Sequence, residues 1–289
     1  MKPQTYHLEF ITPCFCAGAN QAIAEVRPAT IRGKLRWWFR VVGGTSEQEA
    51  EVFGAIRGDS GHASSLSVRV QAHGLLQKWQ PIQFSGMSNT GYVLYFAERS
   101  ADRARWVSGG ALPVGSRFDL QLLWLRPVDE AARATFDLAL YCFLMLGSFG
   151  LRATRGLGTF VCSEVPFSEA AFTDLVSRVK QRSPMFIAEL GAFSGAQSQI
   201  LDALGAQLRG LRQGYSASRP TPLGSSSRPR QTSAVYLRPV REGGDRYRLV
   251  VFEAPAEKVL GRESRAGAPR LGNGVPAPGQ PPRDGFRRR

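Results

Sequence analysis

The densest cluster of side chains suited to binding a polyanion lies in residues 27–40, RPATIRGKLRWWFR, which hold five basic and three aromatic residues. Three arginines recur at four-residue spacing, so on a helix Arg32, Arg36 and Arg40 form one row. Guanidinium groups bind phosphate oxygens through paired, charge-assisted hydrogen bonds. Like charges at this spacing repel one another, and no carboxylate stands between them. An external anion would relieve that repulsion, and the row therefore predicts a phosphate-binding edge.

A helix over about residues 28–42 would position this row. Pro28 suits the first turn of a helix, where its missing N–H has no intrahelical partner anyway. The apolar residues occupy about a third of the helix circumference, as expected of a core-facing stripe: Ile31, Leu35, Trp38, Phe39 and Val42. Trp37 projects outside that stripe and could stack on a base or contact a neighbouring subunit. The alternative is a buried amphipathic helix whose arginines only keep its edge solvated.

A second candidate site is the glycine-rich segment 147–158, GSFGLRATRGLG, between a predicted helix and a predicted strand. Glycines allow backbone amides to approach a phosphate closely, and interleaved arginines can clamp it. The alternative is a turn that only reverses the chain. Together the two motifs give the candidate nucleic-acid contacts Arg32, Lys34, Arg36, Trp37, Arg40, Gly150, Arg152, Arg155, Gly156 and Gly158.

The sequence contains no motif that is typical of a nucleotide cofactor site or a metal site. The order helix, glycines, strand is the reverse of the dinucleotide fingerprint, and Leu35 follows Gly33-Lys34 where a Walker motif needs Ser or Thr. The cysteines match neither a zinc ribbon nor a disulfide scaffold: Cys14, Cys16, Cys142 and Cys162. The three histidines offer no ligand pair on one helical face. We predict no cofactor and no metal site.

Composition points to a nucleic acid as the partner. The chain has 289 residues, 43% of them hydrophobic, which is enough for a sizeable core. Its formal charge of +14 attracts polyanions. The strong preference for arginine over lysine suits bidentate phosphate contacts, or reflects genomic base composition. The longest apolar run, 138–146, is about half of what a bilayer requires, and residues 1–20 lack the features of a signal peptide. We expect a soluble cytoplasmic protein.

The periodicity of apolar residues predicts an α+β fold. Strands are expected at 5–11, 65–72, 91–97, 118–125, 159–165, 234–240 and 247–253, the last two joined by a turn at Gly243-Gly244. Helices are expected at 28–42, 47–53, 130–146, 170–180 and 187–211. Ser46 and Asp129 are the expected caps of the second and third helices.

The first motif resembles a signature of the RAMP superfamily of CRISPR-associated proteins. Residues 27–40, preceded by FITP at 10–13, are similar to the family of subunit one of type III-B (Cmr) effector complexes, as are EVFG at 51–54 and SSLSV at 64–68. The segment 222–239 is similar to the distal part of that family. The glycine-rich segment resembles the loop that marks the superfamily, although Ser148 stands where many members carry glycine.

This resemblance implies a ferredoxin-like (RRM-like) βαββαβ fold. It favours two such domains, at 1–166 and at 167–262, the second smaller or incomplete. Residues 263–289 are rich in Gly, Pro and Arg and are predicted to be a disordered basic tail, which either adds nonspecific RNA affinity or is merely a solvated terminus.

The resemblance also implies a function in antiviral defence. The expected role is a noncatalytic RNA-binding subunit that contacts guide (crRNA) and target RNA near the guide 3′ end, beside other Cmr and RAMP subunits. One alternative is a RAMP-type endoribonuclease that processes guide precursors, with His7 or His62 as general base. The other is a purely architectural subunit.

Overall fold

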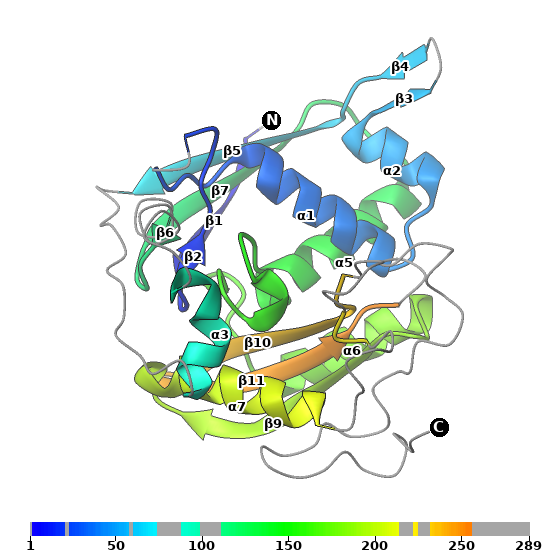
Figure 1. The fold of residues 1–289 in the computed structure, drawn as a ribbon. Coiled ribbons are helices and arrows are strands. Elements are labelled where there is room, and N and C mark those ends of the chain that lie inside the picture. The colour runs from blue at the N-terminus through cyan, green and yellow to red at the C-terminus, as the bar shows by residue number, and fades with distance from the viewer. Residues whose placement is uncertain are drawn as a thin grey trace.

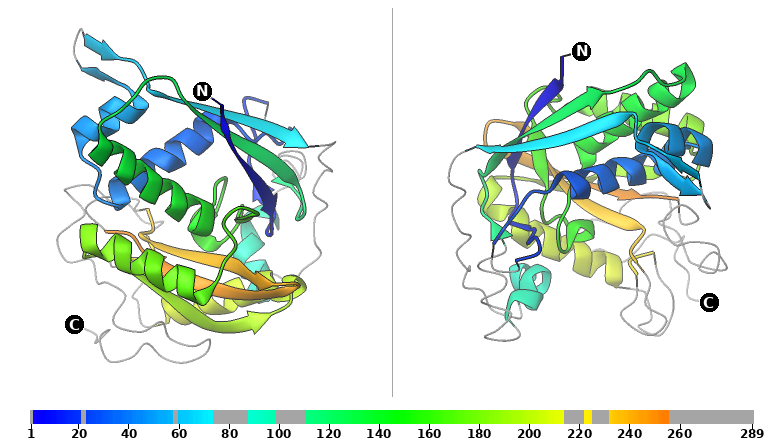
Figure 2. Two further views of the ribbon diagram at one scale, coloured as in Figure 1. Left: turned by 180° about the vertical axis from the view of Figure 1, so that it is seen from behind. Right: turned by 90° about the horizontal axis from the view of Figure 1, so that it is seen from above.

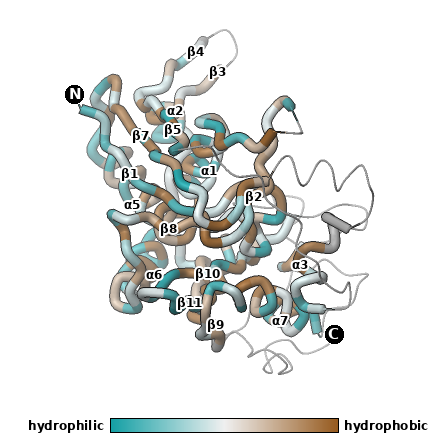
Figure 3. Tube along the Cα trace, turned by 90° about the vertical axis from the view of Figure 1, so that its left-hand side faces the viewer, coloured by the Kyte–Doolittle hydropathy of each residue, from teal (hydrophilic) through white to brown (hydrophobic). Residues whose placement is uncertain are grey.

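Two antiparallel sheets, with helices between them and beyond the second sheet, make up the fold (Figure 1). The computed structural model describes residues 2–20, 23–57, 60–73, 88–98, 111–213, 222–224 and 232–255. The predicted α+β class is confirmed. Figure 3 shows the hydrophobic stretches concentrated toward the middle of the molecule.

The first sheet has the strand order β5-β7-β1-β8, with every neighbouring pair antiparallel. In chain order its strands are β1 (Gln4–Phe10), β5 (Leu66–His73), β7 (Arg117–Trp124) and β8 (Phe160–Cys162). Helix α1 (Pro28–Val41) connects the first two of these strands and α5 (Glu130–Leu146) the last two. This arrangement is consistent with the predicted ferredoxin-like unit.

Helices α1 and α5 lie side by side and carry much of the core. All five residues of the predicted apolar stripe of α1 are buried. Helix α5 begins where predicted, because the Asp129 carboxylate accepts hydrogen bonds from the amides of Ala131 and Ala132. Most of the second half of α5 is buried, since this helix contacts α1, β8, α6 and β10.

The second sheet has the order β10-β11-β9 and is buried on both faces. Its strands are β9 (Ile187–Gly195), β10 (Val235–Gly243) and β11 (Arg246–Glu253), the last two joined by the predicted turn, with positive φ at Gly243 and Gly244. Alternate residues along the hairpin face α1 and α6 (Glu169–Arg182) on one side and α7 (Ile200–Arg212) on the other. Helix α3 (Asn89–Glu98) packs against α7.

The two sheets fall on either side of residue 166, yet they share one hydrophobic cluster. Trp38 of α1 contacts Phe186 and Phe252 from the second half, with ring centroids 6.4 and 5.3 Å apart. The domain boundary at 166 therefore stays a prediction. The predicted tail at 263–289 lies outside the described residues.

Three predictions about individual elements were wrong. Residues 91–97 are helical, because contacts with α7 outweigh their β-branched and aromatic composition. Residues 187–195 form strand β9 rather than helix, because they pair with β11, which comes more than fifty residues later. The cap of α2 (Ser46–Phe53) is Thr45, not Ser46: its hydroxyl accepts from the Gln48 amide, and the Gln48 side chain accepts from the Thr45 amide.

Short elements complete the description. β2 (Cys14–Phe15) pairs with β6 (Ala111–Leu112), and the 3₁₀ turns are η1 (Ala153–Arg155) and η2 (Gln197–Gln199). A hairpin of β3 (Ala55–Arg57) and β4 (Ser60–His62) follows α2 and projects from the body (Figures 1 and 2).

Candidate nucleic-acid interface

The arginine row lies along α1 where α2 packs against it. Arg36 donates to Glu49 Oε1 through Nε at 2.9 Å and Nη2 at 2.6 Å. Arg40 donates to both carboxylate oxygens of the same residue, with Nη2 2.6 Å from Oε1. Glu49 therefore supplies part of the relief from repulsion that the sequence analysis assigned to an external anion. The sequence could not show this pairing, because Glu49 belongs to the next helix.

The row nevertheless keeps a surplus of positive charge. The Glu49 side chain is 9% exposed, whereas those of Arg36 and Arg40 are 37% and 51% exposed. Burial would raise the pKa of Glu49, but hydrogen bonds and charges from Arg40 and Arg36 outweigh it and lower that pKa. Arg32 donates to a neutral acceptor, the Phe53 carbonyl. Two guanidinium groups thus share one carboxylate and keep substantial access to solvent, and Arg32 adds a third positive charge to the row.

An open groove of about 540 Å³ lies beside two members of the row, Arg32 and Arg36. Its other wall is the β3–β4 hairpin, and among the described residues that line it none is acidic: Arg32, Arg36, Phe53, Gly54, Ala55, Ile56, His62 and Ser64. Gly54 ends α2 with φ +75°, and a Cβ there would lie 2.6 Å from the His62 carbonyl oxygen. The close return of the hairpin to α2 therefore requires glycine at this position.

Lys34 and Trp37 are turned toward the second sheet. The Trp37 ring lies 5.0 Å from both Tyr236 of β10 and Trp38, centroid to centroid. Burial, together with the nearby charge of Arg238, lowers the pKa of Lys34 to about 8. Tyr236 already packs against the Trp37 ring and would compete with a base for the predicted stacking contact.

The glycines of segment 147–158 serve close packing inside the protein. Gly158 has φ +64°, a Cβ there would lie 1.9 Å from the Phe149 carbonyl oxygen, and its amide donates to Pro13 O at 2.9 Å. Gly150 and Gly156 also have positive φ, and their missing side chains face β2 and α7. These contacts differ from the predicted role, in which the glycines leave room for a phosphate.

The two arginines of this segment have different environments. Arg155 is 6% exposed and donates to the Leu223 carbonyl at 2.6 Å. The predicted phosphate clamp is thus turned inward, because a distant part of the chain supplies its acceptor. Arg152 is half-buried and has φ 58°, an uncommon value for a residue with a side chain. Of the pair, Arg152 is the one with access to solvent.

Arg238, which sequence reasoning missed, connects the glycine-rich segment to the end of α5. It is 2% exposed and donates to the carbonyls of Leu146 at the end of α5, Ala153 of η1 and Leu237. Burial lowers its pKa to about 9. The charge of Arg238 also lowers the pKa of Lys34 on α1, because the two cations repel each other. The one sequence signal was an arginine at an inward-facing position of a predicted strand.

Two of the three histidines share a carboxylate neighbour, because His7 Nε2 lies 3.9 Å from Asp119 Oδ1, which His73 also contacts. His7 Nδ1 contacts a Glu164 carboxylate oxygen, and this hydrogen bond and charge raise the pKa of His7. His73 Nε2 lies 2.7 Å from Asp119 Oδ1, and His62 lines the groove. Across the described ranges, no three His, Cys, Asp or Glu side chains are placed to hold a metal ion. Within the same ranges, no helix combines the length and hydropathy needed to cross a membrane.

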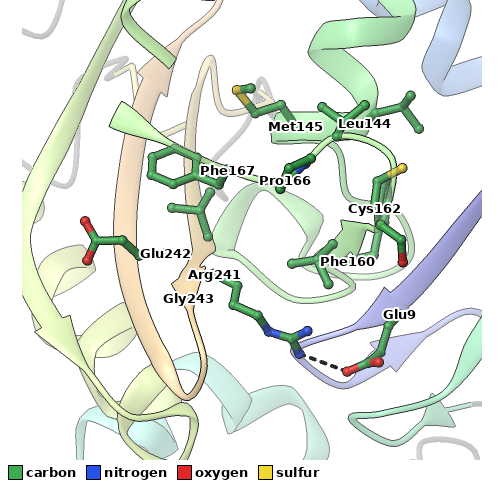
Figure 4. Close-up of a pocket in the computed structure, with 14 residues that line it drawn as sticks. Glu9, Leu144, Met145, Phe160, Cys162, Pro166, Phe167, Arg241, Glu242 and Gly243 are labelled. Atoms are coloured by element: carbon green, nitrogen blue, oxygen red, sulfur yellow. Dashed lines mark hydrogen bonds and ion pairs between the residues drawn. The ribbon is translucent and has the colours of Figure 1, made fainter. Parts of the chain in front are cut away.

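A second cavity, of about 230 Å³, lies between β8 and β10 (Figure 4). Its lining is largely apolar, with Phe160, Met145 and Phe167 among the contributors. At its rim Arg241 donates to Glu9 at 2.9 Å. Arg241 is paired with Glu9, and the carboxylate of Glu242 also lines the cavity. The cavity is therefore less suited to a polyanion than the groove is.

The Glu49 ion pairs predict opposite effects on stability and binding. Glu49→Gln should lower the free energy of unfolding by about 1–2 kcal/mol, because hydrogen bonds to a charged partner are lost. It should strengthen single-stranded RNA binding several-fold, because Glu49 no longer competes for Arg36 and Arg40. Since the folded-state pKa of Glu49 is lowered, its stabilising effect is complete above its ordinary pKa of 4.5 and lost as the pH falls through the folded value. Denaturation at pH 7 and pH 3 and RNA titrations check this; weaker RNA binding by the variant would contradict it.

The fold and the groove identify the class of protein. It is an α+β protein with a ferredoxin-like strand order and a cationic groove beside its first long helix. The model of the RAMP superfamily matches residues 7–161, more than half of the chain. The chain belongs to the RAMP superfamily.

Similar proteins extend this result. The chain is 27% identical over 175 residues to the CRISPR system Cmr subunit Cmr1-2 of Pyrococcus furiosus, covering 53% of this chain and 91% of that protein. The crystal structure of apo Cmr1 from Pyrococcus furiosus superimposes with a TM-score of 0.60 at 20% identity, covering 92% and 91% of the two chains. A chain of the type III-B Cmr-beta structure bound to cognate target RNA gives 0.51 at 11% identity, covering 88% and 95%. Both structures show the similarity of fold.

Proposed function

We propose that this chain is subunit one of a type III-B CRISPR (Cmr) effector complex and binds RNA there without cutting it. Its sequence similarity to a Cmr1-type subunit, which covers 91% of that protein, supports membership of such a complex. The similarity of fold to a chain in a Cmr structure holding target RNA supports the nucleic-acid partner. The subunit contacts guide and target RNA near the guide 3′ end, lies beside other RAMP subunits and acts in cytoplasmic antiviral defence.

The observation that carries this proposal is the surplus positive charge of the arginine row beside an open groove that Arg32 and Arg36 line. Arg36 and Arg40 each retain solvent access, while Glu49 behind them is buried. Gly33, between Arg32 and Lys34, is exposed, and a Cβ there would meet nothing within 4 Å. Glycine within a helix costs about 1 kcal/mol relative to alanine, and here it leaves the surface of α1 open to a bulky ligand. A phosphate backbone fits this combination of charge and space.

The proposal assigns direct RNA contacts to fewer residues than the sequence suggests. Arg32, Arg36 and Arg40 form the primary set, with Arg152 as a separate solvent-accessible cation. Lys34, Trp37 and Arg155 support the interface from behind, because they pack toward the second sheet or the interior. Gly150, Gly156 and Gly158 shape the segment that holds Arg152.

One observation favours an endoribonuclease as a second candidate. His62 lines the groove together with Arg32 and Arg36, and a histidine beside guanidinium groups is an arrangement that can cleave RNA. His7 is less suited to that role, because Glu164 engages its ring.

The test of the noncatalytic role is a double variant. His7→Ala with His62→Ala should leave RNA cleavage by the reconstituted complex at the wild-type rate, since we assign catalysis to other subunits. Gel analysis of end-labelled target and guide-precursor RNA measures this, with native mass determination as the control for assembly. Loss of site-specific cleavage from an intact complex would contradict the noncatalytic role and favour the nuclease.

A further inference from the structure

The β3–β4 hairpin carries an apolar side chain that the fold does not use. Ile56 is 87% exposed, the largest exposed fraction among the described large hydrophobic side chains. Its register partner across the hairpin is Gly61, and a Cβ at Gly61 would meet nothing within 4 Å. Cross-strand side-chain pairs are the usual means by which an apolar residue stabilises a hairpin, and Ile56 has none. The stability of the hairpin therefore does not account for an isoleucine at this position.

The base of the hairpin is held firmly against α2. The Ser64 hydroxyl lies 3.0 Å from the Val52 carbonyl and 2.8 Å from the Leu66 carbonyl, while Arg32 donates to the Phe53 carbonyl. The glycine requirement at position 54 fixes the direction in which the chain leaves α2. Ile56 is thus presented by a fixed support that is itself bonded to the arginine row.

Ile56 faces the same groove as Arg32 and Arg36. A nucleotide presents the matching chemistry, because it carries an anionic phosphate and an apolar base face within one residue. Isoleucine is one of the side chains that proteins place against unstacked bases. In RNA, proteins contact base faces mostly in single-stranded segments, where the bases are unstacked, so we expect an unpaired nucleotide here. The lining residues that the structure describes include two arginines and no carboxylate, which agrees with an anionic ligand.

From this geometry we infer that Ile56 is a contact for the base of a single-stranded RNA nucleotide whose phosphate is bound by Arg32 and Arg36. The inference rests on the proposed function and adds a residue that binds the base rather than the phosphate. Charge contacts at the row alone would hold any polyanion, whereas the hairpin makes the groove respond to the presence of a base.

The test compares two ligands of the same length on the full chain. Short oligouridine carries phosphates and bases, and an oligomer of tetrahydrofuran phosphates carries only the phosphates. Ile56→Ala should weaken oligouridine binding about tenfold, because it removes apolar surface that the base would bury, and change binding of the base-free oligomer less than about twofold. The matched controls are Ile56→Val, which keeps most of the apolar surface, and Leu125→Ala, which removes another exposed hydrophobic side chain outside the groove lining. Both controls should retain wild-type binding, and all variants should retain the wild-type melting temperature.

Equal effects of Ile56→Ala on both oligomers would contradict a base contact, and so would no effect on either. Unchanged RNA binding with loss of the chain from the reconstituted complex would show that the hairpin contacts a protein instead, which also overturns the inference. Arg36→Ala, measured alongside, separates the two proposals. If it leaves oligouridine binding unchanged, the RNA contact at the row is wrong; if it weakens binding while Ile56→Ala does not, only the role of the hairpin is wrong.

Discussion

Replacing Arg32, Arg36 and Arg40 together with alanine should weaken single-stranded RNA binding about 100-fold, at roughly 1 kcal/mol for each lost phosphate contact. It should also reduce the log–log salt slope by about 2, because each contact with single-stranded RNA contributes roughly 0.7. Titrations at several salt concentrations measure both quantities. If this variant kept the wild-type RNA affinity and salt slope, the arginines would only keep the edge of the helix solvated, and the phosphate contacts would be wrong.

The same variant should lose stability, contrary to what the sequence alone suggests. Relief of like-charge repulsion and the helix propensity of alanine predict an unchanged or slightly higher stability. The structure reverses that expectation, because Glu49 is buried and would lose the cations that compensate its charge. We expect the free energy of unfolding to fall by about 2 kcal/mol. Adding Glu49→Gln to the triple variant should recover most of this loss without restoring RNA binding.

Gly158→Ala should be one of the most destabilising single substitutions in the chain. The new Cβ would lie 1.9 Å from the Phe149 carbonyl oxygen, which is backbone and cannot turn aside. The positive φ of +64° adds about 1 kcal/mol for any residue with a side chain. We expect a total loss above about 3 kcal/mol, equivalent to a fall in melting temperature of about 6–12 °C.

Gly115→Ala is the matched control for that substitution. Gly115 has φ +84°, yet a Cβ there would meet nothing within 4 Å, so only the conformational cost of about 1 kcal/mol remains. A Gly158→Ala protein with wild-type melting temperature and reduced RNA binding would contradict the packing role of this glycine. It would instead support the sequence-based view that the segment leaves room for a phosphate.

Local patterns predicted the elements of this fold well. The buried stripe of α1, the Asp129 cap of α5 and the Gly243-Gly244 turn depend on residues a few positions apart, so their signals are contained in short windows of sequence. Strand β9 was missed because its pairing partner, β11, lies far along the chain, and an apolar run without that partner is compatible with a helix.

The candidate site was predictable in part, for the same reason. The spacing of Arg32, Arg36 and Arg40 placed them in one row, as α1 shows. Their partner Glu49 and the acceptor of Arg155 come from other elements, so no local pattern could reveal them. The groove itself exists only because α2 and its hairpin fold back against α1.

Crosslinking of RNA in the assembled complex, with residue-level identification of the adducts, tests the central claim most directly. Our account predicts adducts along the groove, at α1 near Arg32 and Arg36 and at the β3–β4 hairpin, with Arg152 as a separate site. Adducts confined to residues 263–289, with none at α1 or the hairpin, would contradict it.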